Sequence, residues 1–160
     1  MPTIIILKGY LMNSKKISFI PSKSKDELKE IVNFNVQAFA DSHDFAWTEN
    51  NVKNELASGW EVFSVKIDKD IICALFVKKD GENLLTKNTP LKMNYQGQGY
   101  SHIIKEFYEE YAKENKLGSV YNYCPVDNFR MISLNEGHDY HKTGETLGSN
   151  TNMIEWNKKL

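Results

Sequence analysis

The stretch that decides the fold is NYQGQGYSHIIKEFYEEYAKENK, Asn94 to Lys116, where two glycines stand directly before a helical pattern. Its apolar residues recur at three-to-four spacing and predict one buried helix face; they are Ile103, Ile104, Phe107, Tyr108, Tyr111 and Ala112. A helix start leaves backbone N–H groups unpaired at the positive end of the dipole. Glycines before such a start let the backbone wrap closely around a phosphate group.

The charge pattern of this helix also favours an anion at its start. The first turn, Tyr100 to Ile103, contains no acidic residue, although acids are favoured there in ordinary helices. The alternative is a flexible strand-to-helix turn that binds nothing. Two other phosphate motifs fit poorly, because a dinucleotide fingerprint needs a small residue where His102 stands and a P-loop needs Gly-Lys-Ser/Thr.

Composition narrows the class of protein. The chain has 160 residues, 41% of them hydrophobic and 26% charged, which is typical of an ordinary globular protein. The formal net charge of -1 gives no basic excess for nucleic acid, and no apolar run approaches the roughly 18 residues of a membrane helix. Cys73 and Cys124 lie in apolar stretches without zinc spacing, so we expect two buried thiols, no metal and a cytoplasmic location.

The remaining patterns predict strands and helices in the order β-α-α-β-β-β-α-β-α-β-β, a mixed α/β fold. We expect residues 1–11 to be an N-terminal extension or extra strand and residues 12–160 to form a single domain. The first half of the chain predicts a strand at 17–20, a helix opened by a capping box of Ser24 and Glu27, a short helix at Thr48 and a hairpin at 63–77. Further along the chain we expect a strand at about 82–93, a strand at 119–124, a short helix from Asn128 to Gly137 and a strand at 151–156. Pro90 indicates a bulge or an unpaired backbone group in the strand at 82–93.

Two blocks of residues resemble one known family. The first block is Gln96-Gly97-Gln98-Gly99-Tyr100-Ser101, which is similar to the Gln/Arg-x-x-Gly-x-Gly/Ala signature of the GCN5-related N-acetyltransferases, the GNAT superfamily. The second block begins at Asn128, continues through Met131, Leu134 and Asn135, and resembles the family's Asn-x-x-Ala/Met-x-x-Leu/Ile-Tyr/Asn-x-x-x-Gly-Phe segment. Ser101 departs mildly from the first signature, and Asp139 and Tyr140 replace the Gly-Phe pair of the second.

The resemblance implies a single-domain α/β fold with a mixed, mostly antiparallel sheet that splays between its central strands and is flanked by helices. It implies acetyl-CoA as cosubstrate, with the pyrophosphate on the Gln96–Ser101 loop and the pantetheine arm between the splayed strands. Backbone groups near Leu91 and Met93 would bind the arm and polarise the thioester carbonyl. Asn128, Met131 and Asn135 would complete the cofactor site.

Catalytic residues are not assigned by the sequence. Many family members protonate the departing thiolate with a tyrosine, and Asn135 stands at that position here, so Tyr123 or a water would have to substitute. Asp44, Glu49 and Glu55 are candidate bases, although each fits a solvated surface acid better. His102 fits a helix start or a phosphate neighbour, and His138 fits a helix end.

The acceptor site is expected in the segment ADSHDFAWTENN, where Phe45 and Trp47 either form an aromatic wall or pack against the domain edge. The leading hypothesis is an acetyl-CoA-dependent N-acetyltransferase, a monomer or homodimer, acting on a small-molecule or protein amine by direct attack. A catalytically weak CoA-binding regulatory module and an interaction protein with a ligand-free glycine turn are the alternatives. We expect neither a nucleic-acid nor a membrane partner.

Overall fold

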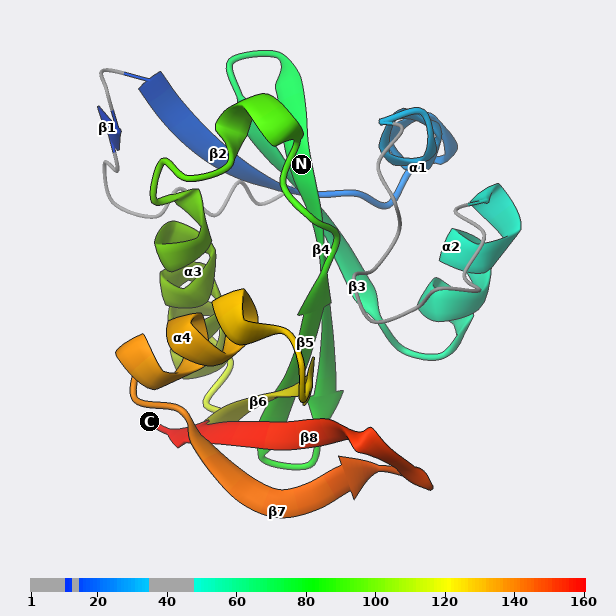
Figure 1. The fold of residues 1–160 in the computed structure, drawn as a ribbon. Helices are drawn as coiled ribbons and strands as arrows, with labels where there is room; N and C mark the ends of the chain where they lie inside the picture. Colours follow the sequence, from blue (N-terminus) through cyan, green and yellow to red (C-terminus); the bar gives the residue numbers. More distant parts are fainter. Residues whose placement is uncertain (1–10, 13–14, 35–47) are drawn as a thin grey trace. The chain divides into compact units, whose positions relative to one another are not determined.

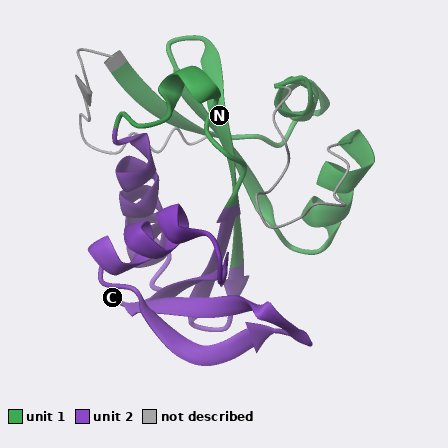
Figure 2. Ribbon diagram, in the orientation of Figure 1, with its two compact units in different colours: residues 1–78, 88–98 green, residues 79–87, 99–160 purple. Residues whose placement is uncertain are grey.

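The structure is a computed structural model that describes residues 11–12, 15–34 and 48–160 (Figure 1). The chain falls into two compact units (Figure 2): residues 1–78 with 88–98 form the first unit, and residues 79–87 with 99–160 form the second. Helices and mostly antiparallel strands alternate along the chain, so the predicted mixed α/β class is confirmed.

The first unit is built on an antiparallel set of strands in the order β1-β2-β3-β4. The strands are β1 (Leu11–Met12), β2 (Lys15–Pro21), β3 (Glu61–Ile67) and β4 (Asp70–Asp80), whose last two residues belong to the second unit. β4 is buried at consecutive positions from Ile71 to Val77, which means that both of its faces are covered.

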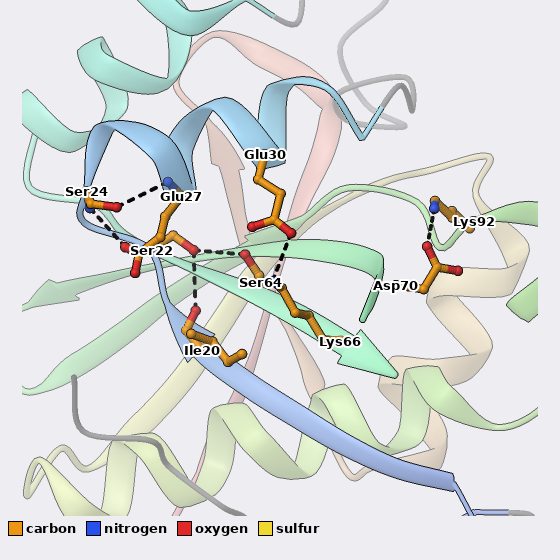
Figure 3. A network of polar contacts seen from close by, with 9 residues as sticks. All are labelled: Ile20, Ser22, Ser24, Glu27, Glu30, Ser64, Lys66, Asp70 and Lys92. Atoms are coloured by element: carbon orange, nitrogen blue, oxygen red, sulfur yellow. Dashed lines mark hydrogen bonds and ion pairs between the residues drawn. The ribbon is translucent and has the colours of Figure 1, made fainter. Parts of the chain in front are cut away.

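Two short helices, α1 (Lys25–Val32) and α2 (Glu49–Ala57), close one apolar cluster with β3 and β4. Its buried members are Leu28, Ile31, Val52, Val62, Ala74 and Phe76. The predicted capping box is present: the Ser24 hydroxyl accepts from the Glu27 N–H at 3.2 Å, and the Glu27 carboxylate accepts from the Ser24 N–H at 2.9 Å (Figure 3). Thr48 caps α2, as its position before the helix predicts.

The strand predicted at about 82–93 is wrong in its extent, because β5 covers only Asn83–Asn88. Pro90 has no N–H to continue the ladder. The Thr89 hydroxyl instead accepts from the Ala74 N–H at 3.0 Å, and the Lys92 N–H donates to the Ile72 carbonyl at 2.9 Å. The expected irregularity at Pro90 therefore ends the strand, and a 3-10 turn, η1 (Met93–Tyr95), follows.

The second unit orders its strands β5-β6-β8-β7. They are β6 (Ser119–Pro125), β7 (His141–Leu147) and β8 (Asn150–Lys159), with α3 (Tyr100–Glu114) and α4 (Phe129–Gly137) between them in sequence. All six apolar residues predicted for the buried face of α3 are buried. Asn128 caps α4 by accepting from the Met131 N–H at 3.1 Å.

Candidate functional site

Both glycines of the loop before α3 have backbone conformations that favour glycine. The φ angle is 72° at Gly97 and 86° at Gly99, in the left-handed region that other residues rarely adopt. Gly99 is the N-cap of α3, and no side chain caps this end of the helix. The backbone N–H groups of the first turn therefore lack the side-chain acceptor that Ser24, Thr48 and Asn128 supply at α1, α2 and α4.

Side chains of the loop hold its own backbone. Gln96 Nε2 donates to the Leu91 carbonyl at 2.9 Å, and Gln98 Nε2 donates to the Asn94 carbonyl at 2.8 Å. Gln96, Gly97 and Gln98 are exposed, so the loop backbone is open to solvent. Tyr100 is buried, which leaves its backbone rather than its ring available at the helix start.

Asp70 anchors the segment that leads into this loop. Its carboxylate accepts from Lys92 Nζ at 2.5 Å and from the Tyr95 hydroxyl at 2.9 Å, and Figure 3 shows the Lys92 contact. The Lys92 hydrogen bond is the main reason that the Asp70 pKa lies below its ordinary value. Met93, between these two anchors, has an 87% exposed side chain.

β5 and β6 pair only over their first residues. The parallel pairs are Asn83 with Ser119, Leu84 with Val120 and Leu85 with Tyr121. β5 then continues to Asn88 and β6 to Pro125 without further pairing. This divergence, which we call the β5–β6 wedge, is the splay that the family resemblance implies.

The residues of the second sequence block take different positions. Asn128 uses its side-chain oxygen to cap α4, which leaves its amide nitrogen as the group that can face a ligand. Met131 is half-buried. Asn135 is fully buried: its Oδ1 accepts from Lys105 Nζ at 2.7 Å and from Asn122 Nδ2 at 3.0 Å, and its own Nδ2 donates to Asn122 at 3.2 Å.

Asn135 was predicted to bind the cofactor, and the structure shows which groups its amide contacts without a ligand. Both ends of its amide are engaged inside the second unit, and its side chain has no exposed surface. Its role toward the cofactor stays a prediction, and the structure places its side chain in a buried polar cluster. The sequence could not show this, because the partner Lys105 lies 30 residues away.

Lys105 is the residue that the sequence reasoning missed. It is 4% exposed, and its Nζ lies 3.9 Å from the centroid of the Tyr140 ring. Burial is the largest cause that lowers its pKa from 10.5 to about 7. The signal in the sequence was a lone lysine beside the apolar stripe of α3.

The two candidate histidines contact each other. His102 Nδ1 lies 2.8 Å from His138 Nε2, with the ring centroids 5.0 Å apart. Burial, and then the charge of His102, lower the pKa of His138. His138 is also the C-cap of α4, as its position after the helix predicted. The contact uses one nitrogen of each ring, so it does not by itself assign either ring a catalytic role.

Tyr123 and Glu49 are two further acid–base candidates among the described residues. Burial raises the pKa of Tyr123, which makes its hydroxyl a weaker acid. Glu49 pairs with Lys53 at 3.2 Å on the surface of α2. Asp44, Phe45 and Trp47 lie outside the described residues. Within residues 11–12, 15–34 and 48–160, no group of three or more His, Cys, Asp or Glu is placed to hold a metal ion. None of the helices in the same part of the chain is long and apolar enough to cross a membrane.

No protein-family model and no curated protein matches the sequence. Solved structures do match the fold. The GNAT domain of S. lividans PAT has a TM-score of 0.72 at 13% identity, covering 99% of this chain and 97% of its own. The Escherichia coli ribosomal-protein-S18-alanine N-acetyltransferase has a TM-score of 0.69 at 14% identity, and the match covers 91% of this chain and 93% of that enzyme. A Bacillus subtilis acetyltransferase in complex with CoA has a TM-score of 0.65 at 13% identity, and the match covers 91% of this chain and 99% of that protein. The chain thus has the fold of the GNAT acetyltransferases.

Proposed function

We propose that this protein, which has the GNAT fold, is an N-acetyltransferase that transfers the acetyl group of acetyl-CoA to a primary amine. The observation that carries the proposal is the start of α3, where two left-handed glycines precede a first turn with neither an acid nor a side-chain cap. Such a turn offers backbone N–H groups and a positive dipole to a pyrophosphate. A solved neighbour of the same fold, from Bacillus subtilis, is in complex with CoA.

The residues of the loop fit this ligand. Gly97 has no atom within 4 Å of where a Cβ would lie, so its glycine is explained by its φ angle and by an open backbone rather than by crowding. We propose that the N–H groups from Gly97 to Ser101 bind the pyrophosphate, because the Gln96 N–H already donates to the Met93 carbonyl at 3.2 Å. The pantetheine arm would enter the β5–β6 wedge, and the Asn128 amide nitrogen would donate to it.

Direct attack is the reaction that these groups support. A neutral amine attacks the thioester carbonyl carbon, the C–N bond forms, and the C–S bond breaks. Backbone N–H groups near Leu91 and Met93 would stabilise the oxyanion, which is a large contribution in acyl transfer. Holding donor and acceptor together supplies much of the remaining rate enhancement. Cys73 and Cys124 are buried and form no disulfide, which supports a route without an acyl-enzyme and a cytoplasmic location.

The acceptor is either a small amine or a protein amine. One neighbour of the same fold is named as an enzyme that acetylates an alanine of ribosomal protein S18, and this shows only what that neighbour does. The second candidate function is a catalytically weak CoA-binding module. It is favoured by Asn135, a poor acid whose amide is fully engaged in the second unit.

Calorimetry with acetyl-CoA tests binding, and an amine panel with detection of free CoA thiol tests transfer. We expect a dissociation constant near micromolar, about -8.2 kcal/mol. Gly99→Asn and Gly99→Asp form a matched pair, because both place a similar short side chain in the left-handed conformation. The aspartate should weaken binding by about tenfold more than the asparagine, which corresponds to about 1.4 kcal/mol of phosphate repulsion.

Equal affinities of two folded variants would contradict the proposed pyrophosphate site. Binding without turnover on any amine would favour the regulatory module. No binding of acetyl-CoA or CoA to the wild-type protein would exclude both functions and leave a ligand-free glycine turn.

A further inference from the structure

Lys105 is a buried cation without a carboxylate to pair with. In the described part of the chain, the hydrogen-bond acceptor of its Nζ is Asn135 Oδ1 at 2.7 Å, and no ion pair is formed. Glu109, one turn along α3, is paired with Lys158 instead. Burying a charge that contacts only an amide oxygen and an aromatic face destabilises the fold. A lysine at such a position therefore indicates a functional role.

The surroundings of Lys105 have unmet hydrogen-bonding capacity. An ammonium has three N–H donors, and Asn135 together with the face of the Tyr140 ring accounts for two of them. The Tyr140 hydroxyl, on a residue that is 1% exposed, has no hydrogen-bond partner in the described part of the chain. Buried polar groups are rarely left unpaired, so this cluster is typical of a place that receives another polar atom.

The cluster is joined to β6 within the second unit through the hydrogen bonds between Asn135 and Asn122. The last β5–β6 pair is Leu85 with Tyr121, and Asn122, which shares the amide network with Asn135, is the next residue of β6. Lys105 is therefore linked, through one amide contact, to the part of β6 that diverges from β5.

We propose that Lys105 is the proton donor to the CoA sulfur as the acetyl group leaves. The inference rests on the proposed function, since it needs acetyl-CoA in the wedge. The amine nitrogen bonds to the carbonyl carbon and the C–S bond breaks, with its electron pair going to sulfur. Sulfur takes a proton from Lys105 Nζ, which becomes a neutral amine. The attacking nitrogen releases its extra proton to water, and Lys105 regains a proton from solvent after CoA leaves.

The electrostatics of the cluster suit this role. Efficient proton donors have a pKa near the working pH, and burial brings that of Lys105 to about 7. Glu109 on α3 raises it, and Lys158 on β8 lowers it. Cys124 on β6, the Tyr140 ring after α4 and His138 at the end of α4 are the other titratable groups that act on or contact this site. Asn135 is an amide, so it orients the ammonium without competing for its proton.

The first test measures the acidity of the bound CoA thiol by its thiolate ultraviolet absorbance, with no turnover involved. A nearby ammonium favours the thiolate, so bound CoA should titrate below the ordinary thiol value of about 8.5. In Lys105→Met, the thiol pKa should rise by about one unit or more. The control Lys113→Met, at an exposed lysine on the same helix, should behave as wild type.

The second test uses the pH–rate profile. Lys105→Met should lower kcat by about a hundredfold with little change in the KM for acetyl-CoA. Asn135→Asp places a carboxylate 2.7 Å from Nζ, so it should raise the lysine pKa and move the basic limb of kcat upward by about one unit. A purely structural lysine would leave the position of that limb unchanged.

The outcomes separate this inference from the proposed function. A folded Lys105→Met protein with unchanged CoA thiol pKa and wild-type kcat would overturn the role of Lys105, while leaving acetyl transfer established. Wild-type protein that does not bind CoA would overturn the proposed function and this inference together. If Lys105→Met does not fold, the pH–rate profile of Asn135→Asp tests the proposal by itself. A basic limb of kcat at the same pH as in the wild type would then refute the proposal.

Discussion

His102 and His138 share a hydrogen bond that joins the first turn of α3 to the C-cap of α4, with 2.8 Å between Nδ1 and Nε2. Only one of two facing ring nitrogens can carry the bridging proton, so the bond is lost when both rings are protonated. The pair therefore makes the junction of these helices sensitive to mildly acidic pH.

Thermal unfolding should report this sensitivity. The folded-state pKa of His138 lies below its ordinary value of 6.5, so the unfolded chain holds the proton more tightly and stability is lost as pH falls from 6.5 through the folded pKa. We therefore expect the Tm to fall over that window. His138→Gln should flatten this part of the profile, and an unchanged acid-side slope in the variant would refute the assignment.

A second stability prediction concerns Lys105→Met. The folded-state pKa of Lys105 is about 7 and its ordinary value is 10.5, so the cost of burying the ammonium is full below pH 7 and is relieved as pH rises from 7 to 10.5. We expect the variant to be more stable than wild type by about 1–4 kcal/mol below pH 7. The advantage should shrink toward pH 10, and denaturant titrations at several pH values measure it. A stability gap independent of pH would show that burial does not lower the pKa of this lysine.

Asp70 should matter for the cofactor although it lies outside the proposed binding loop. Asp70→Asn weakens the contacts to Lys92 and Tyr95 that hold the segment before Gln96. We expect the affinity for acetyl-CoA to fall by about threefold to tenfold, or about 0.7–1.4 kcal/mol. Glu30→Gln is the control, because it removes the partly exposed ion pair with Lys66 at 2.9 Å in the same unit (Figure 3). Equal affinities in the two variants would mean that the Asp70 anchor does not shape the site.

Neither cysteine should be needed for transfer. Cys73 and Cys124 have 0% and 1% exposed surface, and burial raises the pKa of Cys73 to about 12. A thiol in that state is a poor nucleophile. Cys73→Ala and Cys124→Ala together should preserve turnover per folded molecule, measured as acetylated product against the folded fraction. A loss of turnover in well-folded protein would instead point to an acyl-enzyme.

The sequence predicted the features that depend on neighbours along the chain. The capping box of Ser24 and Glu27, the buried stripe of α3 and the cap at Asn128 are set by residues at most a few turns apart, so their periodicity is visible in the sequence. The splay of β5 from β6 came from the family resemblance rather than from the residues. It is confirmed by the pairing that stops at Leu85 and Tyr121.

The features that the sequence could not show depend on distant contacts. The end of β5 at Asn88 reflects the Thr89 hydroxyl bonding to Ala74, 15 residues away. The burial of Asn135 depends on Lys105 and Asn122, and the pairing of His102 with His138 spans 36 residues. Such contacts leave no local periodicity, so residue type and spacing alone did not show that these side chains contact one another. The roles of Phe45 and Trp47 stay predictions.

The most direct test of the central claim is the affinity for acetyl-CoA of two variants at Ser101, in the first turn of α3. Ser101→Asp places a negative charge where an ordinary helix favours one, so the folded protein should be as stable as wild type or slightly more stable. The same charge would face the pyrophosphate, so calorimetry should show affinity at least about tenfold weaker than for the matched Ser101→Asn. That pattern, with stability kept and affinity lost, is what a phosphate at the α3 start predicts. Equal affinities of Ser101→Asp and Ser101→Asn for acetyl-CoA would contradict it.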